Sequence, residues 1–114
     1  MSIQSINPAT GEVLESFKET SDQERLRILA AAHAAFLDWR KAPFATRASL
    51  MRKAAAVLRA RKSEYARLMA LEMGKPIVQG EAEVDKCAWT CDFYAEHAEG
   101  FLAEQPRETD ASTS

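Results

Sequence analysis

Apolar side chains recur every three or four positions along most of the chain after residue 20. This spacing gathers them on one side of an α-helix, so it predicts helical structure. Three stretches show it, at about residues 21–41, 46–73 and 76–103. The pattern leaves open whether the middle stretch is one kinked helix or two. Ser63 is a candidate N-cap for a fresh turn within it.

The start of the chain, residues 2–18, has a pattern typical of β-strands. Val13 and Phe17 alternate with polar positions, and the turn-forming residues 7–11 come before them. These features predict an antiparallel hairpin with a loop of five residues. A two-stranded hairpin is marginally stable alone, so this one must lean on helices or extend another sheet.

Local signals set the ends of the predicted helices. Ser21 and Glu24 have the spacing of a capping box at the start of the first helix. Pro43 stops that helix, because a proline inside a helix removes one hydrogen bond and clashes with the preceding turn. Gly74 suits the left-handed conformation that closes a helix. Pro76 suits the first turn of the next one.

The apolar positions of each predicted helix share a face that is expected to form the core. In the first helix this face is Leu26, Leu29, Ala30, His33, Phe36 and Leu37. The middle stretch offers Leu50, Met51, Ala54, Val57, Leu58, Tyr65, Leu68 and Met69. The last helix has a seam of Ile77, Val84, Ala88, Cys91, Ala95, Ala98 and Leu102. That helix also carries four aromatic residues outside the seam, so it expects neighbours on more than one side.

Composition indicates one globular domain at most. The chain has 114 residues, of which 46% are hydrophobic and 28% charged. Its net charge is −2, so it has no electrostatic footprint for nucleic acid. The basic run at residues 59–62 is interpreted as a solvated helix end. The polar residues 104–114 are expected to form a frayed tail after a folded unit of residues 1–103.

The compartment follows from what the sequence lacks. No apolar run approaches the length of a membrane span, and the N-terminus has no signal-peptide pattern. Only Cys87 and Cys91 could pair, and their spacing on one helix is too constrained for a relaxed disulfide. The sequence therefore predicts a protein of the reducing cytoplasm, with no membrane and no nucleic-acid partner.

A search for catalytic machinery finds no assignable site. The four glycines have neither GxGxxG nor P-loop spacing. Two histidines and two cysteines do not make a metal set, and both cysteines are interpreted as small core residues. His33 is interpreted as a half-buried helix residue. Glu72 is interpreted as a buried or half-buried structural residue, with a site carboxylate as the alternative. Residues 81, 83 and 85 are interpreted as the negative first turns of a helix.

Six short segments, taken in order, resemble the N-terminal segment of the NAD(P)-dependent aldehyde dehydrogenase superfamily. They are residues 6–12 (Ile-Asn-Pro-Ala-Thr-Gly-Glu), 36–40, 47–53, 72–76 (Glu-Met-Gly-Lys-Pro), 83–84 and 92–96. Each is weak alone, but their order and spacing across about 100 residues make the match strong. Within the superfamily, residues 72–76 and the run Cys-Asp-Phe-Tyr-Ala-Glu-His most resemble the succinate-semialdehyde dehydrogenase branch.

The resemblance implies a mainly α piece, with an N-terminal hairpin and three or four helices, of an α/β cofactor-binding domain. The family oxidises aldehydes with a cysteine nucleophile, a glutamate base and NAD or NADP. Those catalytic and cofactor-binding residues come later in family sequences, so none is assigned here. Neither cysteine of this chain matches the nucleophile's motif, and Glu72 does not match the base. NAD or NADP is expected in the complete family enzyme and not on this chain alone.

The resemblance also suggests one substrate-tunnel residue, Lys86. In the family, the helix after Gly-Lys-Pro contributes to the aldehyde entrance tunnel. Lys86 lies on this predicted helix, away from the seam of Val84 and Ala88. It would attract the carboxylate of a dicarboxylic semialdehyde, and the alternative is a solvated lysine.

Two functions follow as hypotheses. The leading one is an N-terminal fragment of an NAD(P)-dependent aldehyde dehydrogenase, inactive in isolation, whose substrate in the complete enzyme would be an aldehyde such as succinate semialdehyde. The alternative is a stand-alone helical interaction module. It would self-associate as a homo-oligomer, or pair with the remainder of a dehydrogenase chain or another subunit.

Overall fold

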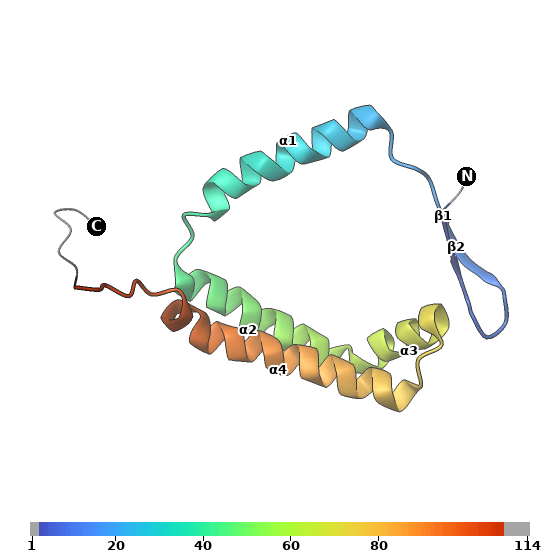
Figure 1. Cartoon of the computed structure of the whole chain (residues 1–114). Helices are drawn as coiled ribbons and strands as arrows, with labels where there is room; N and C mark the ends of the chain where they lie inside the picture. Colours follow the sequence, from blue (N-terminus) through green and yellow to red (C-terminus); the bar gives the residue numbers. More distant parts are fainter. Residues whose placement is uncertain (1–2, 109–114) are drawn as a thin grey trace.

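The structure, a computed structural model, describes residues 3–108 and contains a hairpin followed by four helices (Figure 1). The elements in order are β1 (Ile3–Ile6), β2 (Val13–Phe17), α1 (Asp22–Trp39), α2 (Phe44–Ala60), α3 (Lys62–Met73) and α4 (Ile77–Phe101). The predicted fold class is therefore confirmed. Residues 46–73 fall in two helices. Residues 104–108 of the predicted tail have no helix or strand, and its remainder lies outside the described residues.

The elements form an open ring. Helices α2 and α4 lie side by side and antiparallel, with α3 against the start of α4, while α1 stands across the opening from them (Figure 1). The radius of gyration is 20.6 Å, whereas a compact chain of this length has about 13 Å. The ring measures 66 × 40 × 26 Å along its principal axes. The chain therefore has the secondary structure of a domain without the compactness of one.

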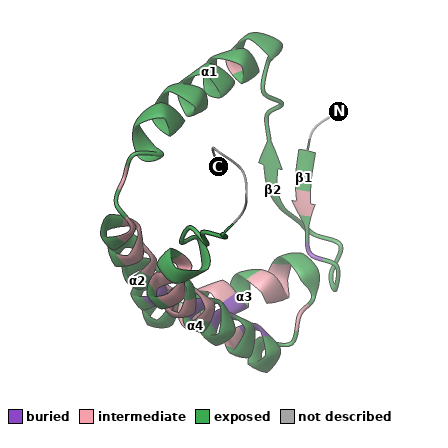
Figure 2. Cartoon of the chain, turned by 60° about the vertical axis from the view of Figure 1, so that its left-hand side comes forward, coloured by how far each residue is buried: buried purple, intermediate pink, exposed green. Residues whose placement is uncertain are grey.

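The core is small and lies where α2, α3 and α4 meet (Figure 2). Its buried apolar residues are Ala55, Ala66, Val84 and Ala88. A Cβ atom added to Gly80 would lie 3.1 Å from both the Cα and the Cβ atom of Ala66. These small side chains let the helices approach closely, and bulkier ones would hold them apart.

The predicted seam of α4 is right in its middle and wrong at its ends. Val84 and Ala88 are buried, and residues 91, 95 and 98 are half-buried. Ile77 and Leu102 are exposed, because α4 is longer than the contacts that α2 and α3 offer it. On α2 and α3, the predicted Leu50, Val57 and Leu68 are also exposed. The buried positions on those helices are alanines that the apolar pattern did not single out.

Helix α1 has no buried residue, so its predicted core face is exposed in this chain (Figure 2). His33 is exposed with the rest of the helix, and the half-buried interpretation is wrong. The physical reason is that α1 stands apart from the other helices. Trp39, its last residue, has the Arg47 guanidinium 5.9 Å from its ring centroid.

Local capping explains where the helices begin and end. The Ser21 side chain accepts a hydrogen bond from the Glu24 backbone N–H at 3.2 Å, as half of a capping box. Gly74 has φ +70° and closes α3 with a backbone bond to Ala70 at 3.0 Å. The predicted cap at Ser63 is wrong. Helix α3 begins one residue earlier, and the Ser63 hydroxyl donates to Glu81 on α4 at 3.2 Å.

The hairpin pairs Ile3 with Phe17 and has an irregularity between Ser5 and Ile6. Its connection is residues 7–12, one residue longer than predicted. Asn7 is buried in that turn, and its side-chain oxygen accepts the N–H of Ala9 at 2.9 Å. Such a side-chain turn stabilises the loop without help from the helices.

Candidate functional site

The two cysteines and two histidines do not form a reactive set. Both are free thiols. Cys87 is exposed, so its interpretation as a core residue is wrong, whereas Cys91 is half-buried. They lie on α4, which has neighbours on one side only. The other histidine, His97, lies with its Nδ1 atom 2.8 Å from the carbonyl oxygen of Phe93, on its own helix. Within residues 3–108, no group of three metal-ligating side chains comes together.

Glu72 ties the hairpin to the helices. Its carboxylate accepts a hydrogen bond from the Ser5 hydroxyl at 2.7 Å, which joins β1 to the end of α3. The predicted structural role is therefore observed, but the predicted burial is wrong, because Glu72 is exposed. Its hydrogen bond is to the hairpin and not to a cysteine or histidine, so Glu72 connects two elements of the fold.

The acidic residues of α4 pair with the basic run at residues 59–62. Lys62 Nζ lies 3.0 Å from Asp85, and Arg59 lies 2.7 Å from Asp92. Asp85 raises the pKa of Lys62 through this hydrogen bond. The basic run lies at the exposed end of α2, as predicted, and is also paired. The interpretation of residues 81, 83 and 85 is corrected in one respect, because they lie beyond the first turn of α4. Both pairs are exposed to solvent, so each contributes little to stability.

A third pair closes the corner between α3 and α4. Lys75, in the segment that links the two helices, forms a salt bridge with Glu83. Together with the left-handed Gly74, this contact fixes the direction in which α4 leaves α3. The corner is thus held by backbone geometry and by one ion pair.

A groove of about 510 Å³ lies between the start of α2 and the end of α4. Its walls include Phe44, Met51, Tyr94 and Leu102. Arg47 also lines it, donates to the carbonyl oxygen of Arg40 at 3.0 Å, and has a buried Nε atom without a hydrogen-bond partner. The groove is mostly apolar, but its lining also includes the guanidinium of Arg52 and the carboxylates of Glu96 and Glu99.

Two of the described glycines, Gly74 and Gly80, are packed against other parts of the chain. A pyrophosphate needs clustered backbone N–H groups, usually supplied by closely spaced glycines before a helix. Gly80 packs against Ala66, and a Cβ on Gly74 would lie 3.3 Å from the Pro8 ring. Neither glycine leaves room for a phosphate. No chemistry of NAD or NADP is therefore assigned to this part of the chain.

Lys86 belongs to a stripe on α4, partly exposed and partly half-buried, on the side of the helix opposite Val84. Trp89, Phe93 and His97 continue this stripe at helical spacing, with adjacent ring centroids 5.4 and 4.4 Å apart. Trp89 is 59% exposed, and Lys86 is exposed as well. Phe101 extends the stripe, 6.0 Å from His97. We call these five residues the outer aromatic face. Lys86 lies away from the buried Val84 and Ala88, as predicted, and its role in a substrate tunnel stays a prediction.

No helix among residues 3–108 is long and apolar enough to cross a membrane.

The arrangement, a hairpin linked to an α2–α3–α4 layer with α1 held apart, is that of a known family. The model of the aldehyde dehydrogenase family matches residues 1–113, so the chain belongs to this family. It is 48% identical over all 114 residues to a probable NADP-dependent succinate-semialdehyde dehydrogenase of Synechocystis sp.. It is 44% identical over 102 residues to the NAD(P)-dependent succinate semialdehyde dehydrogenase Sad of Escherichia coli. The resemblance stated from the sequence motifs is confirmed.

Solved structures show the same arrangement of elements. Succinic semialdehyde dehydrogenase from Streptococcus pyogenes, in complex with NADP⁺, superposes with a TM-score of 0.87 and 38% identity over 94% of this chain. A structure of Gox0499 superposes with a TM-score of 0.90 and 33% identity over 97% of it. The match covers only 24% and 25% of those chains. The present chain likewise spans about a quarter of the length of the Synechocystis relative.

Proposed function

We propose that this chain is the N-terminal part of a succinate-semialdehyde dehydrogenase. The observation that supports this most is its 48% identity, over its whole length, to an enzyme of that name. The reaction joins the aldehyde with water and NADP⁺ and yields the carboxylate, NADPH and two protons. The cofactor is proposed as NADP, or NAD as the alternative, because the relatives' names carry NADP(+) and NAD(P)+. The compartment proposed is the cytoplasm.

In this proposal the chain supplies scaffold to the cofactor-binding domain, and the chemistry comes from elsewhere in the enzyme. Neither of its cysteines matches the motif of the family's nucleophile, and its glycines lack the spacing of a phosphate-binding loop. Residues 1–114 alone are therefore expected to form no NADPH from succinate semialdehyde and NADP⁺. The measurement is absorbance at the wavelength of the reduced nicotinamide, with the purified chain.

The matched control joins this chain covalently to the part of the Synechocystis relative that lies beyond its matching quarter. That fusion is expected to form NADPH, because it contains the later segments that carry the family's catalytic and cofactor-binding residues. NADPH formation by the 114-residue chain alone would contradict the inactivity. A folded fusion without activity on succinate semialdehyde would contradict the proposed function.

Lys86 is proposed to favour substrates with a second carboxylate. It lies three residues before Trp89 on the outer aromatic face, whose rings would contact the hydrocarbon part of a short semialdehyde. Lys86→Met in the active fusion keeps the length of the side chain and removes its charge. It is expected to lower kcat/KM for succinate semialdehyde about tenfold relative to an uncharged aldehyde, the equivalent of about 1.4 kcal/mol.

The control for Lys86 is Lys53→Met, since Lys53 is an exposed lysine on α2. It changes the net charge equally and is expected to leave the substrate ratio unchanged. Comparable loss of both aldehydes in Lys86→Met, or no change in their ratio, would show that Lys86 is a solvated lysine.

A stand-alone interaction module is the second candidate function. The observation that favours it is the large number of exposed apolar side chains on every element of the ring. Such a module would form a homo-oligomer or pair with a dehydrogenase subunit.

A further inference from the structure

The guanidinium of Arg47, in the first turn of α2, is oriented by three contacts. It donates a hydrogen bond to the carbonyl oxygen of Arg40 at 3.0 Å. Its Cζ atom lies 5.5 Å from the ring centroid of Phe44 and 5.9 Å from that of Trp39. A side chain that the chain already holds in one orientation loses little further freedom when it binds a ligand.

The charge of this guanidinium is half-buried and has no carboxylate partner among residues 3–108. Its Nε atom is buried without a hydrogen-bond partner. Buried N–H groups of native proteins are nearly always paired with the protein, with ordered water or with a ligand. Because the positive charge is delocalised over the whole guanidinium, an anion beside it would offset the cost of its burial.

The groove beside Arg47 has the size and the lining of a small-molecule site. Its volume of about 510 Å³ falls within the range of ligand pockets, about 300–1,000 Å³. Apolar side chains of both helices make up most of the lining, among them Met51 and Tyr94. Ligand pockets combine such a lining with a few polar groups that fix the orientation of the ligand. Arg47 supplies such a group here.

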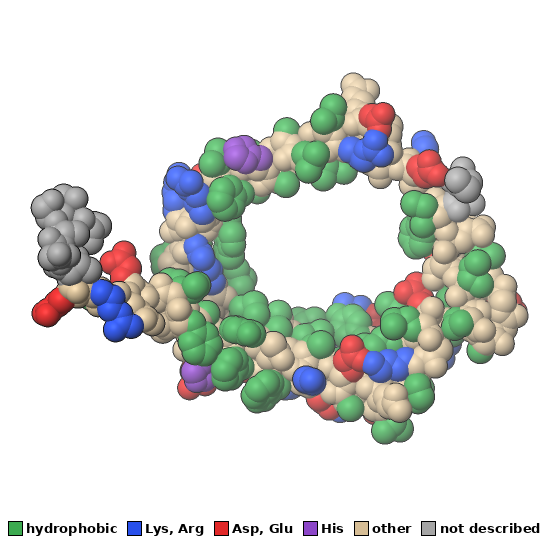
Figure 3. Space-filling view, viewed as in Figure 1, with side chains coloured by type: hydrophobic (Ala, Val, Ile, Leu, Met, Phe, Trp, Pro, Cys, Tyr) green, Lys and Arg blue, Asp and Glu red, His purple; other side chains and the backbone are tan. Residues whose placement is uncertain are grey.

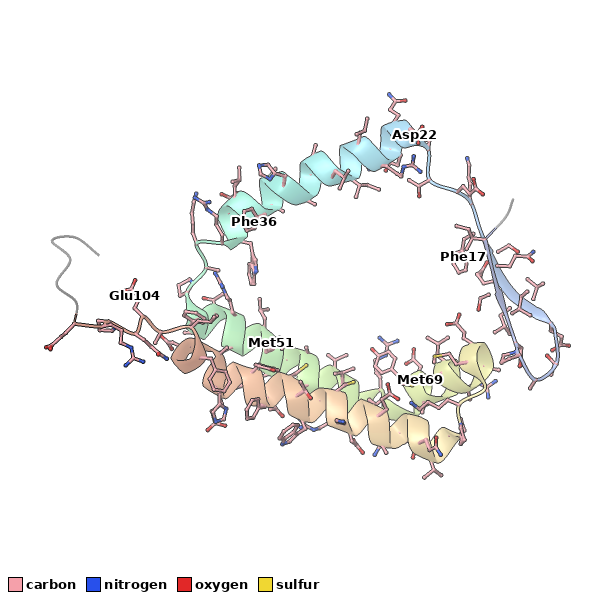
Figure 4. All side chains as sticks on the ribbon, viewed as in Figure 1. Phe17, Asp22, Phe36, Met51, Met69 and Glu104 are labelled. Atoms are coloured by element: carbon pink, nitrogen blue, oxygen red, sulfur yellow. The ribbon has the colours of Figure 1, made fainter. Side chains whose placement is uncertain are left out.

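The polar and apolar parts of the groove follow one another along α2. The groove lies where α2 begins and α4 ends, at one end of the ring (Figure 4). Basic side chains lie at the junction of α1 and α2, and hydrophobic side chains continue along α2 from there (Figure 3). Met51 comes one turn after Arg47, about 6 Å further along the helix. This order suits a ligand with a charged group at one end and a hydrocarbon chain behind it.

Three further charged residues line the groove, namely Arg52, Glu96 and Glu99. All three are exposed to solvent. Exposed charges keep their hydration and interact weakly with other charges. Arg47 is the half-buried charge of the lining, so its sign is expected to decide which ligand binds. A single cation balances one negative charge, which favours a carboxylate over a phosphate with nearly two.

We propose that this groove binds a small amphiphilic carboxylate. The carboxylate group pairs with the guanidinium of Arg47, whose planar fork matches its two oxygen atoms. The hydrocarbon chain lies along Met51 and Tyr94. None of the groove's lining residues belongs to the outer aromatic face. The site is therefore separate from the position proposed for Lys86, and it does not depend on the proposed function.

The test titrates the purified 114-residue chain with sodium octanoate by isothermal titration calorimetry at low salt. We expect a Kd of about 0.1 mM, in keeping with a ligand of this size in a largely apolar pocket. The neutral 1-octanol and the cationic octylamine have the same chain length. Each is expected to bind at least about tenfold more weakly than octanoate, because neither pairs with Arg47.

Two substitutions separate the charge from the groove. Arg47→Met removes the charge and is expected to weaken octanoate about tenfold, with little change for 1-octanol. Ala45→Leu fills part of the groove from an exposed position in its lining, and is expected to weaken both ligands about tenfold. The matched control is Arg67→Met, which removes an exposed arginine on α3 outside the groove. It is expected to change Kd less than twofold. Circular dichroism checks that each variant keeps its helix content.

Every outcome bears on the proposal. Preference for octanoate that is lost in Arg47→Met, kept in Arg67→Met and weakened by Ala45→Leu supports it. Octanoate binding no tighter than that of 1-octanol would show that Arg47 holds no anion. Tighter binding of octylamine would show that Glu96 and Glu99 decide the sign of the ligand. Equal loss in Arg47→Met and Arg67→Met, or no effect of Ala45→Leu, would place the ligand outside the groove. Each of these three results overturns the proposal.

Discussion

In the isolated chain, amide hydrogens of α1 are expected to exchange with solvent at least about 100-fold faster than those at the centre of α4. Exchange from a helix follows the free energy of local opening. Opening α1 uncovers no buried side chain, whereas opening α4 uncovers Val84 and Ala88 and disrupts the contacts with α2 and α3. A difference of about 2.7 kcal/mol in opening free energy corresponds to that factor.

Hydrogen–deuterium exchange with mass spectrometry measures this directly, on peptides that cover residues 22–39 and 80–92. The peptide over β2 is an internal control, because β2 is also exposed throughout and is expected to exchange as fast as α1. Protection of α1 equal to that of α4, at a dilution where the chain is monomeric, would contradict the expectation. It would mean that α1 folds back onto the other helices in solution.

Most of the element boundaries could be predicted because local chemistry determines them. Ser21 caps α1 through its own side chain, and Gly74 ends α3 by adopting a left-handed conformation. Pro43 separates α1 from α2 because a helix cannot continue through it. These signals act within one turn of the chain. They therefore predict the same helix ends whether or not the remainder of the fold is present.

The buried faces could not be predicted equally well, because periodicity shows which residues share a side and not what covers it. The apolar pattern gave most weight to large residues such as Leu50, Leu68 and Phe36, which are exposed here. The core instead uses Ala55 and Ala66, whose small size matters only when another helix comes close. A small-residue pattern, with Gly80 facing Ala66, is the signal that would have located it.

The candidate site shows the same division. The absence of an assigned nucleophile, base or phosphate loop rested on sequence motifs, and it stays a prediction. Charge pairing across helices, such as Arg59 with Asp92, depends on tertiary placement and was missed. The signal available in the sequence was a run of basic residues at the end of one helix and several acidic residues two helices later. The role of Lys86 stays a prediction.

The contact between Gly80 and Ala66 gives the expected result of largest effect on stability. A Cβ at Gly80 would meet the Ala66 backbone, which is not the flexible end of a side chain and cannot turn away. Gly80→Val adds a branched side chain at that point and forces α3 from α4. Overpacking of this kind typically costs about 1–3 kcal/mol. We expect the free energy of unfolding to fall by about 2–3 kcal/mol, near the upper end of this range. The reason is that the buried core is small, so this contact makes up a large part of it.

Urea denaturation followed by circular dichroism measures the loss, and Gly100→Val is the matched control. Gly100 lies near the end of the same helix, and a Cβ there would meet nothing within 4 Å. Since glycine is a poor helix former, the control is expected to leave stability unchanged or raise it by up to about 0.5 kcal/mol. Equal midpoints for the two variants would show that α3 and α4 do not depend on this close approach. Their corner would then be held by Gly74 and by the salt bridge between Lys75 and Glu83.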